Sequence, residues 1–221
     1  MEREQCWVCR RPKETCLCPV EAPIPIRTKI VLLMHDREWK HQRTGTGRIT
    51  CMNLLDAEII HGLALDEHPR LRALIDNPAN ACFLLYPGAG SYNLSTGAFP
   101  ADTVGNRRLV VFLVDATWDG AKSLIRHSPR LLELPRLMFT PSEPSQFIIK
   151  RQPKKEYLST VEATHQLLLA LESAALDEYP DKQRLLREFY RMRDYQIERA
   201  QSDKNPRRRN KNRGTPAGEA E

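Results

Sequence analysis

The feature that most constrains the fold is a run of six apolar residues, 109–114, that ends directly in a carboxylate. This run is rich in β-branched and aromatic residues, which predicts a strand buried on both faces, as in the centre of a parallel sheet. Asp115-Ala116-Thr117-Trp118 follows, and residues 119–126 have helical composition. Ligands of open α/β sheets bind at the carboxyl ends of the strands. Asp115 and Thr117 are therefore candidate site residues; the alternative is that they only cap the next helix.

Apolar patterns elsewhere in the chain predict further strands and helices. Strands are expected at 28–34, 81–86 and 136–140, and helices at 49–61, at 163–176 and from residue 181 onward. We expect a loop over the mixed, polar residues 91–107. Strands that alternate with helices and consist of continuous apolar runs predict an α/β fold with a mainly parallel sheet flanked by helices.

Four cysteines near the amino end form the most specific motif that the residues alone provide. Cys6, Cys9, Cys16 and Cys18 lie within thirteen residues, and the first pair has CxxC spacing. Four thiolates can enclose one tetrahedral Zn²⁺, and such a closed site is structural. An iron–sulfur cluster or a redox dithiol is the alternative. Cys51 and Cys82 lie among apolar residues, and we expect them to be small core residues.

Composition limits the compartment and the partners. No apolar run has the length of a membrane span, and residues 1–5 lack a signal-peptide core, so we expect a cytoplasmic protein with reduced cysteines. Residues 199–221 hold seven bases against three acids, whereas the rest of the chain is near neutral, with 27 bases and 25 acids. A basic tail favours a polyanionic partner, and a solubilising disordered end is the alternative. Because the sequence has neither a phosphate-binding loop nor a dinucleotide fingerprint, nucleotide hydrolysis and nicotinamide chemistry are disfavoured.

Three further motifs border the predicted elements. Arg43 and Arg48 flank a glycine-bearing helix start, which could receive a phosphate or carboxylate. Tyr86-Pro87-Gly88-Ala89-Gly90 follows a strand, and its glycines allow close backbone approach to a ligand or form an ordinary turn. Phe147 beside Lys150-Arg151 suits nucleic acid, and an edge strand with Phe147 in the core is the alternative. Ser159-Thr160-Val161-Glu162 is a capping box.

These motifs together resemble the DTW-domain family. Asp-x-Thr-Trp at 115–118 is similar to its signature, and His35 and Glu38 match its His-x-x-Glu element. Residues 43–48 resemble Arg-Thr-Asn-Thr-Gly-Arg with Gly45 in place of Asn, and 85–88 match Leu-Tyr-Pro-Gly. The stretch 145–153 resembles Ser-x-Tyr-x-x-Arg-Lys-x-Pro, with Phe147 for Tyr and the basic pair reversed. Residues 159–163 match Ser-Thr-x-Glu-Ala, and some members have a similar cysteine knuckle.

The resemblance implies a SPOUT-related, knotted fold and transfer of the 3-amino-3-carboxypropyl group of S-adenosylmethionine to N3 of a tRNA uridine, with methylthioadenosine released. Asp115 would accept the N3 proton or orient the imide. The implied catalytic residues are Asp115, Thr117 and Trp118, although Trp118 could instead pack in the core. The implied donor-binding residues are Leu85, Tyr86, Pro87, Gly88, Asp115, Thr117, Ser145, Thr160 and Glu162. The expected RNA-binding residues are Arg43, Arg48, Lys150, Arg151, Arg207, Arg208 and Arg209.

The expected organisation is a zinc knuckle at 1–25, a catalytic DTW domain at 26–198 and a basic tail at 199–221. The expected partner is tRNA, with no membrane association and no obligate protein partner. Three alternative functions stay open: a SPOUT-like RNA methyltransferase, an aminocarboxypropyltransferase of ribosomal RNA, and a non-enzymatic zinc RNA-binding protein. Product mass distinguishes the first from the main hypothesis, and binding of S-adenosylmethionine distinguishes the last.

Overall fold

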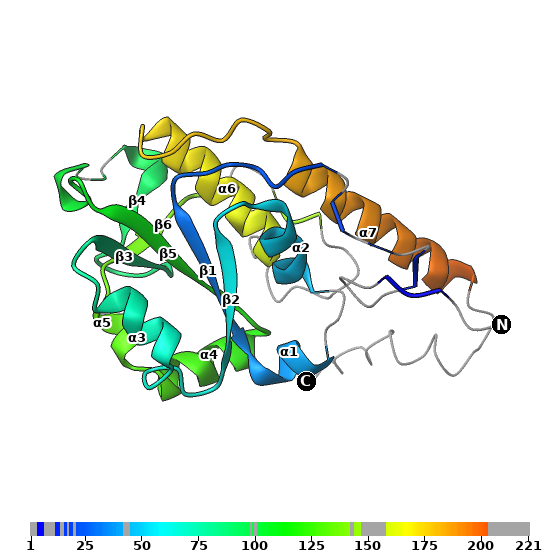
Figure 1. Ribbon diagram of the computed structural model, residues 1–221, viewed down its shortest axis with the longest axis horizontal. Helices are drawn as coiled ribbons and strands as arrows, with labels where there is room; N and C mark the ends of the chain where they lie inside the picture. Colours follow the sequence, from blue (N-terminus) through cyan, green and yellow to red (C-terminus); the bar gives the residue numbers. More distant parts are fainter. Residues whose placement is uncertain are drawn as a thin grey trace, which may run out of the picture.

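A single parallel sheet lies at the centre of the molecule (Figure 1). The computed structural model describes residues 4–6, 12–13, 16, 18–19, 21–41, 45–97, 99, 101–141, 144–146 and 158–202. Neighbouring strands of this six-stranded sheet run parallel, and their order across it is β2-β1-β5-β3-β6-β4. The strands are β1 Lys29–His35, β2 Ala57–Gly62, β3 Asn80–Leu85, β4 Tyr92–Asn93, β5 Arg108–Asp115 and β6 Arg136–Met138. The predicted α/β fold with a mainly parallel sheet is confirmed.

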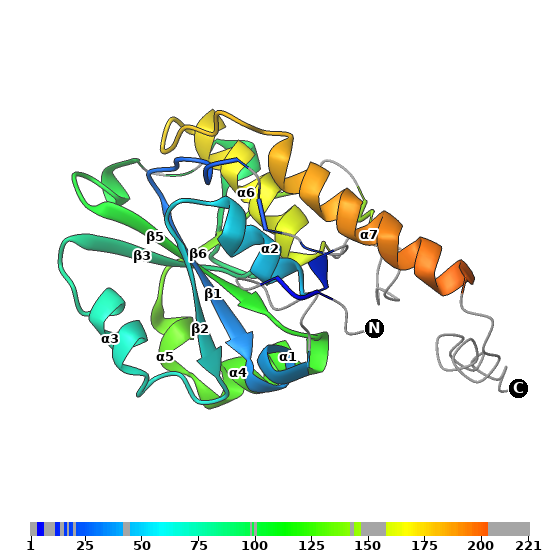
Figure 2. The ribbon, with the colours of Figure 1, turned by 45° about the vertical axis from the view of Figure 1, so that its right-hand side comes forward.

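Helices cover both faces of this sheet (Figures 1 and 2). One face carries α2 (Thr46–Asn53), α6 (Thr160–Ser173) and α7 (Arg184–Ser202), and their apolar residues share one core cluster. The other face carries α3 (Pro69–Ile75), α4 (Trp118–His127) and α5 (Arg130–Glu133), with a second cluster. The short helix α1 (Asp36–His41) follows β1 and buries none of its residues.

Strands β1 and β5 are apolar between their end residues, which suits strands whose two faces are both covered. Along β1, Ile30 belongs to the cluster under α2 and α6, whereas Val31 belongs to the cluster under α3 and α4. Val111 and Phe112 of β5 divide in the same way, and all four side chains are fully buried. This alternation is the period of a strand, in which neighbouring side chains point to opposite faces. The apolar run at 109–114 therefore has the role predicted from the sequence.

The chain changes direction across the sheet between β1 and β5. The connection after β1 passes through α2 to β2 on one side, whereas the connection after β5 passes through α4 and α5 to β6 on the other. β1 and β5 are neighbours, and Asp115 at the end of β5 pairs with Met34. In open α/β sheets such a switch point is where the crevice for a ligand forms. The topology thus places Asp115 at the expected position of a ligand site.

The helix predicted over residues 49–61 is wrong in its second half. Helix α2 ends at Asn53, and Ala57–Gly62 forms β2, which pairs with β1 from Ile30↔Ala57 to His35↔Gly62. Apolar residues at helical spacing continue through this segment, but Leu55, one of them, is 65% exposed. Pairing with the edge of β1 satisfies the backbone of residues 57–62, and this non-local contact overrides the local pattern.

Other element boundaries differ from prediction by a few residues. The predicted loop at 91–107 contains β4 and two 3₁₀ turns, Leu94–Thr96 and Ala101–Thr103. The sequence patterns did not predict α1, α3 or α5, which are short.

In the described part of the chain, no helix has both the length and the apolar character that crossing a membrane requires. The knot implied by the family resemblance stays a prediction.

Candidate functional site

Asp115 lies where two helices begin. Residues 109, 111 and 113 of β5 face the core under α2 and α6, so the alternation carries Asp115 to the same face. The Thr160 hydroxyl, on the first residue of α6, donates a hydrogen bond of 2.6 Å to Oδ1 of Asp115. This contact joins residues 45 positions apart in the chain. Two of the predicted site residues are therefore in direct contact.

The other carboxylate oxygen of Asp115 lies against the first turn of α2. A β-carbon added to Gly47 would fall 2.0 Å from Oδ2, well inside the 3.0 Å limit that real β-carbons respect. The amino end of a helix carries partial positive charge, which favours a carboxylate there. Sequence reasoning did not name Gly47 as a site residue; its position inside the Arg-Thr-x-Thr-Gly-Arg pattern was the only signal.

Thr117 is the N-cap of α4, because its Oγ1 accepts a 3.3 Å hydrogen bond from the Gly120 amide. The capping alternative for Thr117 is therefore correct as local geometry, and a contact of this residue with a donor stays a prediction. Trp118, the first residue of α4, is 38% exposed. It lies three residues after Asp115, and its exposure contradicts the alternative that it is a buried core residue.

The Glu162 carboxylate is the centre of a buried polar cluster. The capping box predicted at Ser159–Glu162 is confirmed, and Glu162 is only 6% exposed. It accepts hydrogen bonds from the Ser145 hydroxyl at 2.8 Å and from the Gln146 amide at 2.6 Å, besides those from the Ser159 amide and hydroxyl. Ser145 and Glu162 were both predicted to bind a donor. The observed contacts show that they join residues 144–146 to the start of α6.

The predicted donor loop follows β3, which ends at Leu85. The Tyr86 amide donates to the Leu137 carbonyl at 3.0 Å, so the loop begins beside β6. Arg136 donates from Nη2 to the Ala89 carbonyl at 2.5 Å, and its Nη1 lies 3.1 Å from the position of a β-carbon on Gly88. Arg136 therefore fixes this loop by a hydrogen bond to its backbone. Gly90 has φ +78°, a left-handed conformation that favours glycine.

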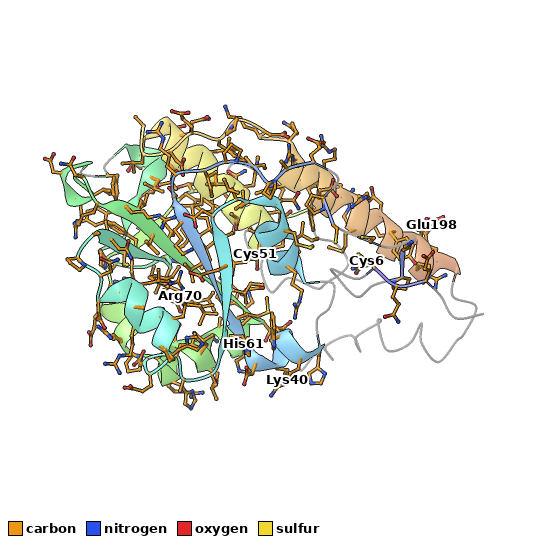
Figure 3. The ribbon with its side chains drawn as sticks, viewed as in Figure 1. Cys6, Lys40, Cys51, His61, Arg70 and Glu198 are labelled. Atoms are coloured by element: carbon orange, nitrogen blue, oxygen red, sulfur yellow. The ribbon has the colours of Figure 1, made fainter. Side chains whose placement is uncertain are left out.

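Arg48, a predicted RNA ligand, is part of an aromatic stack beside the site. Its guanidinium lies 4.1 Å from the centre of the Trp39 ring and donates to the Trp39 carbonyl. The Trp39 ring also stacks on His61, with the ring centres 4.4 Å apart, and His61 contacts Asp36 at 3.0 Å. The hydrogen bond from His61 lowers the pKa of the Asp36 carboxyl. This stack joins α1 to β2. In Figure 3 the two elements can be found by the labels of Lys40 on α1 and His61 on β2. Its residues belong to three elements, so no local spacing predicted it.

Three of the four predicted zinc ligands lie together. The sulfurs of Cys6, Cys16 and Cys18 are all within 4.8 Å of one another, and could hold a metal ion. The sulfurs of Cys6 and Cys18 are 3.7 Å apart. Around a tetrahedral zinc with Zn–S bonds of about 2.3 Å, neighbouring sulfurs lie about 3.8 Å apart. The observed spacing therefore fits a four-thiolate site. Figure 3 labels Cys6 near the end of α7, and Arg191 of α7 donates to the Cys16 carbonyl.

The remaining two cysteines are half-buried and distant from this cluster in the chain. Burial raises the pKa of Cys51 to about 12 and that of Cys82 to about 11. These values describe unreactive thiols, in agreement with the expectation of core residues.

Part of the predicted site lies outside the described residues. This part comprises Cys9, Arg43, Phe147, Lys150, Arg151, Arg207, Arg208 and Arg209. Most of the predicted RNA-binding set thus stays a prediction, as does the division of the chain at residues 25 and 198.

The sheet, its switch point and the carboxylate between two helix starts define an open, parallel α/β protein with a candidate ligand site at the carboxyl edge. The chain belongs to the DTW domain family, which matches residues 3–197. The resemblance inferred from short motifs is therefore confirmed over nearly the whole chain.

Curated relatives in animals carry one name. The chain is 30% identical to tRNA-uridine aminocarboxypropyltransferase 2 of Drosophila melanogaster over 203 residues, 89% of this chain and 76% of that protein. It is 28% identical to the protein of the same name in Mus musculus over 174 residues, 77% of this chain and 57% of that protein. The chain thus spans about three quarters of the fly protein and little more than half of the mouse protein. No solved structure matches the sequence significantly.

Proposed function

We propose that this protein transfers the 3-amino-3-carboxypropyl group of S-adenosylmethionine to N3 of a tRNA uridine and releases methylthioadenosine. Family membership and the names of the fly and mouse relatives support this reaction. The observation that carries it is the position of Asp115 at the switch point between β1 and β5, where a ligand of this fold binds.

The proposed chemistry is a displacement at carbon. The bond from uridine N3 to the transferred carbon forms as the bond from that carbon to sulfur breaks. The bonding electrons go to sulfur, which changes from a sulfonium to the neutral thioether of methylthioadenosine. The proton of N3 goes to Asp115 if this residue acts as the general base. In the alternative role Asp115 orients the imide, and another base takes the proton. Because the sulfonium already activates the carbon, we expect most of the rate enhancement to come from positioning.

The donor would bind at the loop after β3, with Thr117 nearby. Leu85, Tyr86, Pro87 and Gly88 are the residues proposed to contact it, and Arg136 holds this loop through Ala89, with its guanidinium beside Gly88. Ser145, Thr160 and Glu162 each already have a side-chain partner within the protein. We therefore propose that they hold the site in place rather than contact the donor directly.

We also propose that Cys6, Cys9, Cys16 and Cys18 hold a structural Zn²⁺. Four thiolates fill the tetrahedral coordination of zinc, so the ion would supply stability rather than an open site for chemistry. The 3.7 Å separation of the Cys6 and Cys18 sulfurs supports this ligand set. The amide of Cys18 also donates to the Cys16 sulfur at 3.4 Å, a contact that stabilises a thiolate.

The RNA would reach the site over basic residues. Arg43, Arg48, Lys150, Arg151 and the arginines at 207–209 are proposed to contact phosphates. Arg48 is already packed on Trp39, so its contribution would be to orient α1 and the start of α2 as well. The cytoplasmic location expected from the sequence stays a prediction.

The decisive experiment is mass spectrometry of nucleosides from unmodified tRNA incubated with the purified protein and S-adenosylmethionine. We expect a uridine carrying the aminocarboxypropyl group, with methylthioadenosine formed in equal amount. A methyl-sized increment would replace the proposed reaction by methyl transfer. The modified uridine in ribosomal RNA but not in tRNA would replace the acceptor. No binding of S-adenosylmethionine would favour a non-enzymatic zinc RNA-binding protein.

A further inference from the structure

We infer that Gly47 and Thr160 are positioning residues that hold the Asp115 carboxylate in one orientation at the carboxyl edge of the sheet. Thr160 restrains one carboxylate oxygen by a hydrogen bond, and Gly47 leaves the space that the other oxygen occupies. The catalytic consequence of this arrangement rests on the proposed function, whereas the arrangement itself does not.

The Thr160 side of this arrangement is rigid. Thr160 is the first residue of α6, directly after the N-cap Ser159, and its carbonyl accepts a 2.7 Å hydrogen bond from the Thr164 hydroxyl. A β-branched side chain in a helix has few rotamers. Its hydroxyl is thus aimed at Oδ1 of Asp115 at 2.6 Å by the same helix start that Glu162 fixes.

The Gly47 side depends on the absence of a side chain. Gly47 is the second residue of α2, where φ is not positive, so its backbone does not require glycine. Space does: a β-carbon here would be 2.0 Å from Oδ2 and 2.8 Å from Cγ of Asp115. The N-cap of α2 is Gly45, which has no side chain to cap the helix, and the first turn of α2 contains no acidic residue. The Asp115 carboxylate supplies negative charge at this helix start.

A carboxylate that is hydrogen-bonded at one oxygen, with the space for the other oxygen kept free, needs little reorganisation when a substrate arrives. A displacement of about 1 Å in a reacting group can lower a rate by about 100-fold. Gly47 and Thr160 would therefore act on the reaction through Asp115, without touching the donor or the uridine. Thr160, which the family resemblance implied to be a donor-binding residue, receives a different role here.

The geometric part is tested by a double-mutant cycle on thermal unfolding of the full chain. Alanine is a better helix former than glycine, so Gly47→Ala should stabilise α2 in the absence of a clash. We expect Gly47→Ala to lower Tm in the wild-type background but to leave it unchanged or raise it in Asp115→Ala. The 3.1 Å contact with Leu32 Cδ1 is present in both backgrounds and cancels in the cycle. An equal change of Tm in both backgrounds would overturn the proposed close packing.

The functional part is tested by kinetics of Thr160→Val and Thr160→Ser. Valine keeps the shape and removes the donor, whereas serine keeps the donor. We expect Thr160→Val to lower kcat by about 10-fold to 100-fold, the range of one hydrogen bond to a charged group, with KM for S-adenosylmethionine unchanged. Thr160→Ser should restore most of kcat. A raised KM with unchanged kcat in Thr160→Val would make Thr160 a donor contact and overturn the inference.

The two tests separate this inference from the proposed function. If the wild-type protein transfers no group to any RNA, the proposed function fails, and the unfolding cycle still decides whether Gly47 and Asp115 are packed together. If transfer occurs and both variants at position 160 behave like wild type, the proposed function holds and the positioning role fails.

Discussion

The Glu162 carboxylate accepts a 2.8 Å hydrogen bond from the Ser145 hydroxyl and so joins two segments 17 residues apart. The same carboxylate completes the capping box of α6, whose first residue contacts Asp115. One buried acid therefore connects residues 144–146 with the helix start that restrains the candidate catalytic carboxylate.

Glu162→Gln should destabilise the protein. An amide in place of the carboxylate presents NH₂ to neighbours that are themselves donors, so at least one hydrogen bond is lost. We expect the free energy of unfolding to fall by about 1–3 kcal/mol, as for a buried hydrogen bond to a charged group. Denaturant unfolding measures this change. Ser145→Ala, which removes a single donor from the cluster, serves as the matched control and should have the smaller effect; an equal effect of the two would contradict the central role of Glu162.

Asp115→Asn should abolish transfer while the fold persists. The amide is isosteric and can still accept from Thr160, but it cannot take a proton. We expect kcat to fall by about 10²-fold to 10⁴-fold, the usual contribution of a general base. Nucleoside mass spectrometry measures the product, and zinc content and tRNA affinity should match wild type. Near-normal activity would show that Asp115 orients the substrate at most.

Removal of metal should destabilise the amino-terminal segment and expose its thiols. We expect purified protein to contain zinc, and Cys6→Ser to reduce its zinc content, whereas Cys82→Ala should retain it. Elemental analysis measures the metal. After chelation, iodoacetamide at neutral pH should label Cys6, Cys16 and Cys18 but not Cys51, because burial raises the pKa of Cys51 to about 12. Labelling of Cys51 at the same rate would contradict its buried environment.

The contribution of Glu58 to the free energy of unfolding should disappear in acidic solution. Burial raises the pKa of the Glu58 carboxyl, but hydrogen bonds from Arg70 and Lys29 lower it more, so its pKa is below the ordinary 4.5. A depressed pKa stabilises the folded chain fully above the unfolded value, and this contribution is lost as pH falls through the folded value. The stability difference between wild type and Glu58→Gln should thus be largest near neutral pH and shrink below about pH 4.5. Unfolding curves between pH 3 and 7 measure it.

A matched control for this prediction is Glu67→Gln. The Glu67 side chain is 87% exposed and pairs with Arg72, so its ion pair is screened by solvent. We expect its unfolding curves to follow those of wild type at every pH. A constant offset between wild type and Glu58→Gln across the whole range would show that Glu58 acts by packing rather than by charge.

Local patterns were sufficient for the elements that are buried on both faces and for the helix caps. The apolar run at 109–114 predicted a central strand because it is rich in β-branched and aromatic residues, and it forms β5. The capping box at 159–162 is recognisable because its hydrogen bonds lie within four residues. The cysteine spacing likewise predicts a metal site without any knowledge of the fold, and three of the four sulfurs lie together.

The edge strand β2 and the surroundings of Asp115 were decided only by tertiary structure. Residues 57–62 have a helical pattern but pair with β1, because an unpaired strand edge offers them hydrogen bonds that no sequence window contains. Gly47, Thr160 and Asp115 belong to α2, α6 and β5, and they meet only after the chain has crossed the sheet. The sequence by itself thus indicated which residues are candidates for the chemistry. Their mutual positions required the packing of two helix starts against one strand end, since contacts between distant segments leave no local periodicity.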